Sequence, residues 1–226
     1  MSNISDSGLL ALQAIRVKGF AATEVVSESV ALSEEETLKI LNEFADEGKV
    51  IYRENQAIWM LTPDGRSYGE KLLASEVDSL GIRSEIDSSY KEFLQVNAGF
   101  LVLCTDWQLR PSPEGSDGEP VINDHSDSEY DREVINRLVE LDNHVQPICA
   151  ALKDNLERFA TYGDRFTYAL KLVLDGEVDW FTKPMIESYH TVWFELHENL
   201  LSTLGIDRAS ESSSCLLYTS PSPRDS

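Results

Sequence analysis

The stretch that decides the fold of the N-terminal part is residues 50–66, VIYRENQAIWMLTPDGR. Two runs with alternating apolar residues, 50–53 and 57–61, are separated by three polar residues, which predicts a two-stranded hairpin. Thr62 follows the second run as a candidate helix N-cap, and Pro63 comes next, where its missing N–H removes no helical hydrogen bond. The stretch therefore predicts strand, turn, strand and helix in that order.

Three helices are predicted before this hairpin, over about residues 8–18, 23–29 and 34–47. Ser33 and Glu36 have the spacing of a capping box, in which each side chain bonds a backbone N–H at the start of the third helix. The helical period predicts that this helix buries one face, which carries Leu38, Leu41 and Ala45 with Ile40 and Phe44 beside them.

Three helices, a hairpin and the Thr-Pro-Asp-Gly-Arg junction resemble the winged helix-turn-helix domain of MarR-like regulators. The resemblance covers residues 1–75. It implies that the third helix is a recognition helix that enters the major groove of DNA, while the hairpin, or wing, contacts the minor groove or the backbone. The residues that the resemblance places against double-stranded DNA are Lys39, Asn42, Arg53, Asn55 and Arg66.

The charge of the chain opposes such binding. Its 226 residues include 19 Lys and Arg against 40 Asp and Glu, a net charge of −21, whereas nucleic acid attracts positive surfaces. On the third helix, Glu35, Glu36 and Glu43 would lie near the phosphates. From the resemblance we expect a DNA-binding transcriptional regulator. The acidic charge leaves an alternative, a protein-interaction adaptor whose acidic winged helix meets a basic partner without binding DNA.

Residues 76–211 are predicted to form an acidic all-α domain of four or five bundled helices that dimerises or senses an effector. Residues 110–128, rich in proline and glycine, are predicted to be a loop, and no strand is expected. The first helix is predicted to bury Ile86, Tyr90, Phe93, Leu94, Asn97 and Leu101. The later helices are predicted over residues 134–159 (one helix, or two that meet near Pro147), 166–174 and 186–204. The fold class is thus mostly α, a winged helix with a two-stranded wing followed by an all-α bundle.

Aromatic residues and histidines of this second domain are candidates for an effector pocket, because they combine contact area with a polar tip. The same residues would also serve as the core of a bundle, which is their commoner role. The candidate ligand-binding residues are Trp107, His125, His190 and Trp193.

Neither a catalytic site nor a metal site is predicted, and no cofactor is expected. Glu187 and His190 have the spacing found in carboxylate-bridged di-iron bundles, but such sites use the motif twice. An acid–base pair such as Asp127 with His190 stays open, which makes an enzyme the third hypothesis. Cys104 and Cys149 are predicted to be buried as small hydrophobic residues.

The remaining expectations concern location and partners. The chain has no apolar run of about 18 residues, as a membrane span needs, and no signal-peptide pattern at its start. We expect a cytoplasmic homodimer, with a small-molecule effector or a basic protein as a further partner and no membrane contact.

Residues 212–226 are predicted to be a disordered tail. Residues 215–226 resemble translated sequencing-adapter DNA, and a genuine Ser/Pro-rich tail is the alternative, so we expect the natural chain to end near Ser214. The whole chain also resembles bacterial winged-helix regulators, through residues 105–108, 123–127 and 188–197. That resemblance implies a regulator without implying a mechanism.

Overall fold

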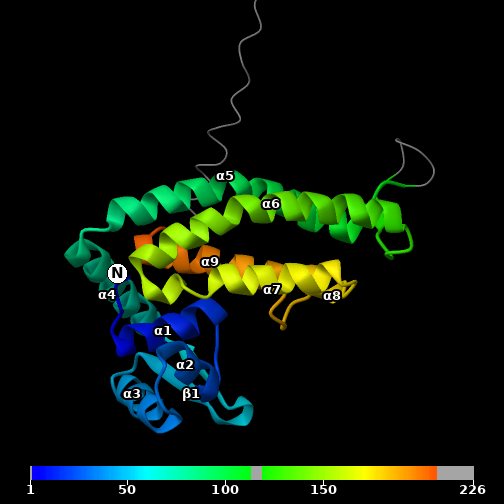
Figure 1. The fold of residues 1–226 in the computed structure, drawn as a ribbon. Helices are drawn as coiled ribbons and strands as arrows, with labels where there is room; N and C mark the ends of the chain where they lie inside the picture. The colour runs from blue at the N-terminus through cyan, green and yellow to red at the C-terminus, as the bar shows by residue number, and fades with distance from the viewer. Residues whose placement is uncertain (1, 113–118, 208–226) are drawn as a thin grey trace, which may run out of the picture. The chain divides into compact units, whose positions relative to one another are not determined.

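The computed structural model describes residues 2–112 and 119–207, drawn in colour in Figure 1. The described part is mostly helical, as predicted, with two small antiparallel sheets. It forms two compact units. Among the described residues, the hairpin unit comprises Ser5–Arg83 and 197–207, and the helical unit comprises 2–4 and Ser84–Leu196.

This division is not linear in sequence, because residues 197–207 join the hairpin unit. The predicted boundaries, residues 1–75 and 76–211, stay a prediction. The predicted tail, residues 212–226, lies outside the described residues. Within residues 2–112 and 119–207, no helix is long and apolar enough to cross a bilayer.

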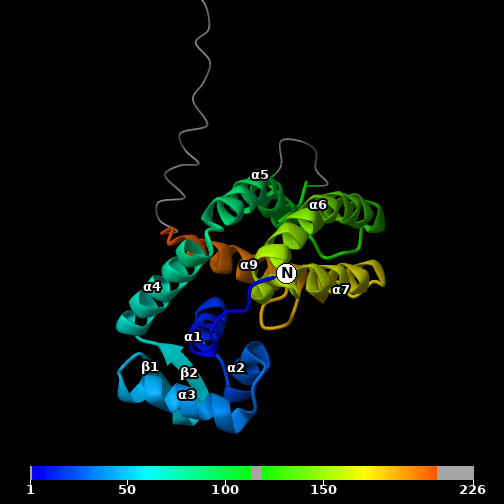
Figure 2. The ribbon, with the colours of Figure 1, turned by 60° about the vertical axis from the view of Figure 1, so that its left-hand side comes forward.

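The hairpin unit has the predicted order of elements in Ser5–Arg83 (Figure 2). Its helices, strands and the 3-10 turn η1 are α1 (Ser7–Lys18), α2 (Thr23–Val30), α3 (Glu34–Asp46), β1 (Val50–Arg53), η1 (Glu54–Gln56), β2 (Ile58–Leu61) and α4 (Pro63–Leu80). Their common core consists of Ala11, Leu12, Ile15, Ala21, Val26, Val30, Leu41, Val50 and Trp59.

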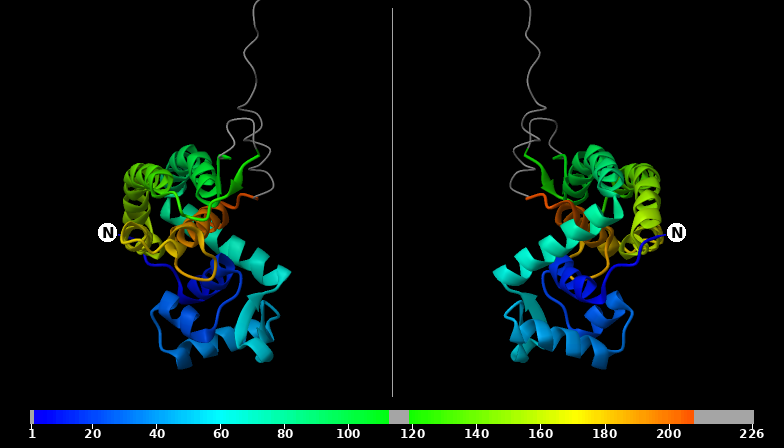
Figure 3. Two further views of the ribbon diagram at one scale, coloured as in Figure 1. Left: turned by 90° about the vertical axis from the view of Figure 1, so that its right-hand side faces the viewer. Right: turned by 90° about the vertical axis from the view of Figure 1, so that its left-hand side faces the viewer.

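The hairpin has a third backbone partner that the sequence did not reveal. β1 and β2 pair antiparallel, with Val50 opposite Leu61, and the pair can be followed from two sides in Figure 3. Ala21, between α1 and α2, forms a further antiparallel bridge to Trp59 of β2. The Ala21 N–H donates to the Trp59 carbonyl at 3.1 Å, and the Trp59 N–H donates to the Ala21 carbonyl at 2.7 Å. The hairpin is thereby tied to the segment that joins the first two helices.

Helix α3 begins with the predicted capping box. The Ser33 hydroxyl accepts from the Glu36 N–H at 3.3 Å, and the Glu36 carboxylate accepts from the Ser33 N–H at 3.1 Å. Leu41 is buried as predicted, but the prediction for Leu38 was wrong, since 38% of it is exposed. Thr37, four residues before Leu41, takes the inward position instead, so the buried face is rotated by one residue.

The start of α4 lies unusually close to the backbone that precedes β1. The Thr62 N–H donates to the Lys49 carbonyl at 3.0 Å, and the Thr62 hydroxyl donates to the Gly48 carbonyl at 2.7 Å while accepting from the Gly65 N–H at 3.0 Å. A Cβ atom at position 65 would lie 1.8 Å from the Lys49 carbonyl oxygen. Only glycine fits this contact, which accounts for the glycine in the junction motif.

The helical unit is built around aromatic side chains of its last helix. Its elements are α5 (Arg83–Gln108, with Arg83 itself in the hairpin unit), β3 (Leu109–Arg110), β4 (Val121–Ile122), α6 (Ser128–Asn155), the 3-10 turn η2 (Glu157–Phe159), α7 (Tyr162–Leu174), α8 (Asp179–Thr182) and the part of α9 (Tyr189–Leu204) up to Leu196. The Trp193 ring of α9 lies 4.3 Å from that of Phe100 on α5 and 5.8 Å from that of Phe166 on α7. These rings join three helices into one core.

Several predictions for the helical unit need correction. β3 lies at the start of the predicted loop 110–128 and β4 lies within it, where no strand was expected, and two-residue strands are too short to give a period. Of the two alternatives for residues 134–159, the structure has the single helix α6 through Pro147, because one exposed proline removes only one backbone donor. α9 begins at Tyr189 rather than at residue 186. Leu101, predicted to be buried, is 56% exposed.

We predict that Gly65→Ala lowers the free energy of unfolding by about 3 kcal/mol, because α4 must move away from the Lys49 carbonyl. Gly69→Ala is the matched control on the same helix, since its Cβ would meet Leu12 at an ordinary 3.8 Å. That variant should be roughly 0.5 kcal/mol more stable than the parent. Urea denaturation compares the two variants, and equal stabilities would contradict the close approach.

Candidate functional site

The predicted DNA contacts are exposed on the hairpin unit. Lys39 and Asn42 lie on α3, and Arg53 and Asn55 lie at the end of β1 and in η1, all with exposed side chains. Arg66 of α4 is also exposed, but its guanidinium lies 3.9 Å from the Glu198 carboxylate. Its charge is therefore partly offset within the unit, and the DNA-binding role of the five residues stays a prediction.

Acidic side chains dominate the surface of α3. Over the described residues of this helix and its C-cap, Lys39 is the one exposed cation. Lys49, just beyond, pairs with Glu47 and lies 3.5 Å over the Tyr68 ring. The exposed acidic residues, called the acidic surface below, are Glu34, Glu35, Glu36, Glu43, Asp46 and Glu47.

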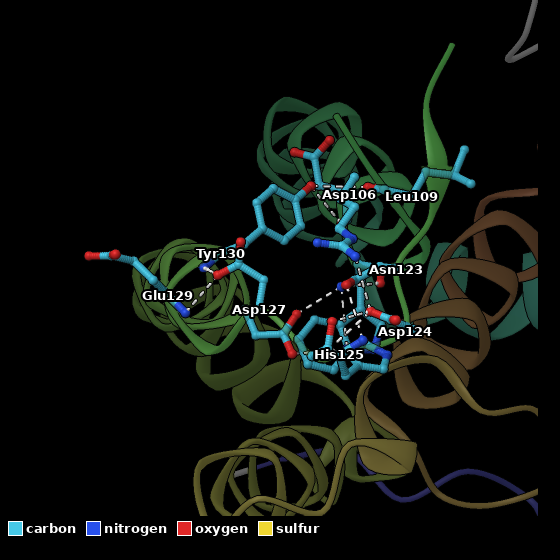
Figure 4. A network of polar contacts seen from close by, with 12 residues as sticks. Asp106, Leu109, Asn123, Asp124, His125, Asp127, Glu129 and Tyr130 are labelled. Carbon is cyan, nitrogen blue, oxygen red and sulfur yellow. Dashed lines mark hydrogen bonds and ion pairs between the residues drawn. The ribbon is translucent and has the colours of Figure 1, made fainter. Parts of the chain in front are cut away.

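A second cluster of polar residues joins the end of α5 to the start of α6 (Figure 4). Buried Asn123 donates through its amide to the Asp131 carboxylate at 2.7 Å and to the Trp107 carbonyl at 3.1 Å. The Asn123 N–H donates to the Gln108 carbonyl at 2.8 Å. One asparagine thus fixes the segment after β4 on two helices.

His125 completes this cluster. Its Nδ1 lies 3.0 Å from the second Asp131 carboxylate oxygen, and its ring lies 4.4 Å from the Trp107 ring. The residue has a φ of 58°, in the left-handed region, which the surrounding bonds must stabilise. A carboxylate on Nδ1 orients an imidazole as in acid–base catalysis. The nearby Ser126 hydroxyl donates to the Asp124 carboxylate at 2.6 Å.

The four candidate ligand residues fall into two groups. Trp107 lies with His125 and is also covered by Phe181, whereas His190 and Trp193 both stack on Phe100. Both tryptophans are 3% exposed, and the Trp193 N–H donates to the Asn97 side chain at 2.9 Å. Their ligand-binding role stays a prediction.

The residues considered for an acid–base pair, Asp127 and His190, and for a metal site, Glu187 and His190, make other contacts in the structure. The Asp127 carboxylate caps α6, accepting from the Tyr130 N–H at 3.1 Å, and burial lowers the pKa of His190. Glu187 accepts from Arg165 at 2.7 Å. Within residues 2–112 and 119–207, no interaction joins Asp127 to His190, and no group of three or more candidate ligands could hold a metal ion.

Sequence reasoning missed Asp142, a buried carboxylate of α6. It accepts from the Tyr189 hydroxyl at 2.9 Å and from the Gln146 amide at 3.2 Å. Burial raises the pKa of Asp142 above its ordinary 3.8, and these hydrogen bonds offset part of the rise. Burial also raises the pKa of the Cys104 and Cys149 thiols to about 12, so both are protonated at neutral pH.

The hairpin unit also has a polar cavity of about 370 Å³. At its wall, the half-buried Arg16 side chain donates to Glu70 at 2.7 Å and to Glu198 at 3.0 Å. These three residues are far apart in sequence, so no local pattern could indicate the site. The lining residues are Arg16, Arg66, Glu70, Glu198, Leu201, Gly205, Ile206 and Asp207.

Comparison of the chain with protein-family models, with curated proteins and with solved structures finds no match. The function is therefore argued from the side chains of this chain.

We predict that Asn123→Ala lowers the free energy of unfolding by about 2 to 3 kcal/mol, because Asp131 and the Trp107 carbonyl lose a buried donor. Asp124→Ala is the neighbouring control. It removes an exposed contact with Arg110 and should change stability by less than about 1 kcal/mol. Urea unfolding of both variants measures the free energy of unfolding. Equal decreases in the two variants would contradict a stabilising role for the buried hydrogen bonds of Asn123.

We predict a pH-dependent effect of Asp142→Asn. Because the folded pKa of Asp142 is raised, its contribution to stability is complete below the unfolded value of 3.8 and is lost as pH rises through the folded value. The asparagine cannot ionise, so the stability of the variant relative to the parent should rise over that window and then level off. Urea titrations at a series of pH values measure the difference, and a constant value would refute the raised pKa.

Proposed function

We propose that the chain is a protein-interaction adaptor whose hairpin unit binds a basic partner through the acidic surface of α3. The observation that supports this most directly is the charge of that helix, with six exposed acidic residues against Lys39 among its described residues and C-cap. Such a surface attracts and orients a positively charged partner, and it repels nucleic acid.

Exposed apolar side chains support a protein as the partner. Leu38 of α3 is 38% exposed amid the acidic residues, and Ile51 and Tyr52 of β1 are 47% and 42% exposed. A large apolar group within a charged surrounding is typical of an interface, in which apolar contacts stabilise the complex and charges select the partner. The expected partner surface is therefore basic with apolar positions between the cations.

A DNA-binding transcriptional regulator is the second candidate. The order of elements supports it, together with the bridge from Ala21 to β2, which adds a third short segment to the hairpin as in winged helices. Lys39 and Asn42 are exposed where a recognition helix would meet base edges. Binding of this kind would gain little from released counterions, because the acidic residues oppose the phosphates.

The two candidates predict opposite results with two fluorescent probes at ~50 mM salt, a basic peptide of Lys, Arg and Leu and a random-sequence DNA duplex. We expect the peptide to bind and the duplex not to bind, measured by anisotropy. The double variant Glu35→Lys/Glu43→Lys should weaken peptide binding about tenfold, since two attractive charges become repulsive.

The matched control places the same charge change on α6 of the helical unit. Glu133→Lys/Asp154→Lys, at two exposed positions, should leave the affinity for the peptide nearly unchanged. Equal weakening by both double variants would show that only net charge matters and would overturn the adaptor. Duplex binding that Lys39→Ala and Arg53→Ala abolish would establish the regulator instead.

A further inference from the structure

Helix α5 has two apolar faces, and the described residues of the chain cover only one of them. Its inner face contributes Phe93, Phe100 and Trp107 to the core of the helical unit. On its outer side, Leu101 is 56% and Val102 is 52% exposed. Ala98, Leu101, Val102, Thr105 and Leu109 follow the spacing of one helical face, and Ile122, opposite Leu109 in β4, is 78% exposed. These six residues are called the α5 apolar face.

The composition of this face is unlike that of an ordinary solvated helix surface. Residues 93–105 contain no charged side chain, a length of about 20 Å along the helix. The Thr105 hydroxyl donates to the Leu101 carbonyl at 3.0 Å, so its one hydrogen-bond donor is used within the helix. By contrast, the neighbouring helix exposes Glu129, Arg132, Glu133, Arg137 and Glu140.

Helix α5 lies along the upper edge of the helical unit in Figure 1. The Leu109 side chain points away from the polar cluster in Figure 4. A continuous apolar patch of this kind marks a surface that another molecule covers.

We propose that the α5 apolar face binds the same face of a second copy of the chain, with the two helices antiparallel about a two-fold axis near Ala98 and Gly99. These are the smallest residues at the face, so the helices approach most closely there. Lys91 and Asp106 each lie seven and a half residues from that point, about 11 Å along the helix. A two-fold axis therefore brings Lys91 of each copy beside Asp106 of the other.

The charge pattern favours a second copy over other partners. Between residues 93 and 105 the face offers no carboxylate to a basic protein and no cation to DNA. Lys91 pairs with Asp87 at 2.6 Å and Asp106 with Arg137 at 2.7 Å, so the new contacts extend existing ion pairs. The face lies in the helical unit, so the inference is independent of the adaptor function.

Salt dependence separates this association from the proposed function. Each copy carries a net charge of −21, so two copies repel each other at long range, and salt screens that repulsion. The apolar contact itself does not depend on screening, and the Lys91–Asp106 contacts, which salt weakens, are expected to contribute less than the relief of this repulsion. Dimerisation should therefore strengthen as salt rises, whereas binding of a basic partner should weaken.

Sedimentation equilibrium of the full chain tests the surface. The parent should dimerise, and Leu101→Glu/Val102→Glu should weaken the dimer by about a hundredfold, because two charges would be buried in the interface. Leu174→Glu is the matched control, since Leu174 of α7 is 57% exposed outside the face. An unchanged circular dichroism spectrum shows that each variant is folded.

A mixing experiment tests the antiparallel arrangement. Lys91→Glu alone and Asp106→Lys alone should each weaken the dimer about tenfold, because like charges then meet twice. An equimolar mixture of the two variants should dimerise nearly as tightly as the parent. In the mixed dimer, the introduced glutamate of one copy meets the introduced lysine of the other, and the native Lys91–Asp106 pair remains at the second contact.

Three results would overturn the proposal: a parent chain that stays monomeric at high salt, a dimer that Leu101→Glu/Val102→Glu leaves intact, or an equal effect of Leu174→Glu. A mixture that fails to restore the dimer would overturn the two-fold geometry. None of these outcomes depends on whether the basic peptide binds, so this proposal and the adaptor function fail separately.

Discussion

The hairpin unit depends on one close backbone contact, that of Gly65 with the Lys49 carbonyl. This carbonyl accepts from the Thr62 N–H, and the Thr62 hydroxyl in turn caps α4. The contact therefore fixes where the hairpin ends and where α4 begins. Because α3 ends just before Lys49, the same contact also fixes the distance between α3 and the strands. The surface proposed to bind a partner is thus held in place by a main-chain contact rather than by its own side chains.

The parts of the fold that sequence predicted are those with local causes. The capping box of Ser33 and the cap formed by Thr62 act within four residues, and the helical period persists over whole helices. The bridge from Ala21 to Trp59 and the strands around Asn123 depend on residues far apart in the chain, so no short pattern could indicate them. The winged-helix class, which rests on the order of elements, stays an interpretation.

Which face of a helix is buried was the less predictable part of the fold. Leu38 and Leu101 both fit the helical period, yet both are exposed, because a helix with apolar residues on more than one side can bury either. The candidate site residues were equally hard to predict from the sequence, because their surroundings depend on tertiary packing. Trp107 and Trp193 are buried against other rings in the core, and the cavity beside Arg16 unites residues that are distant in sequence. Apolar residues in the sequence predict that a helix has a buried face. Which face that is, and which residues cover it, depends on the packing of the whole unit.

The two proposed binding surfaces, the acidic surface of α3 and the α5 apolar face, differ in charge. A net charge of −21 makes any contact between two acidic surfaces repulsive, so copies of the chain cannot associate through α3. The α5 apolar face has no charge between residues 93 and 105, so there only long-range repulsion opposes contact, and physiological salt screens it within about 8 Å. The proposed association through the α5 apolar face therefore meets less charge repulsion than a contact between two acidic surfaces would.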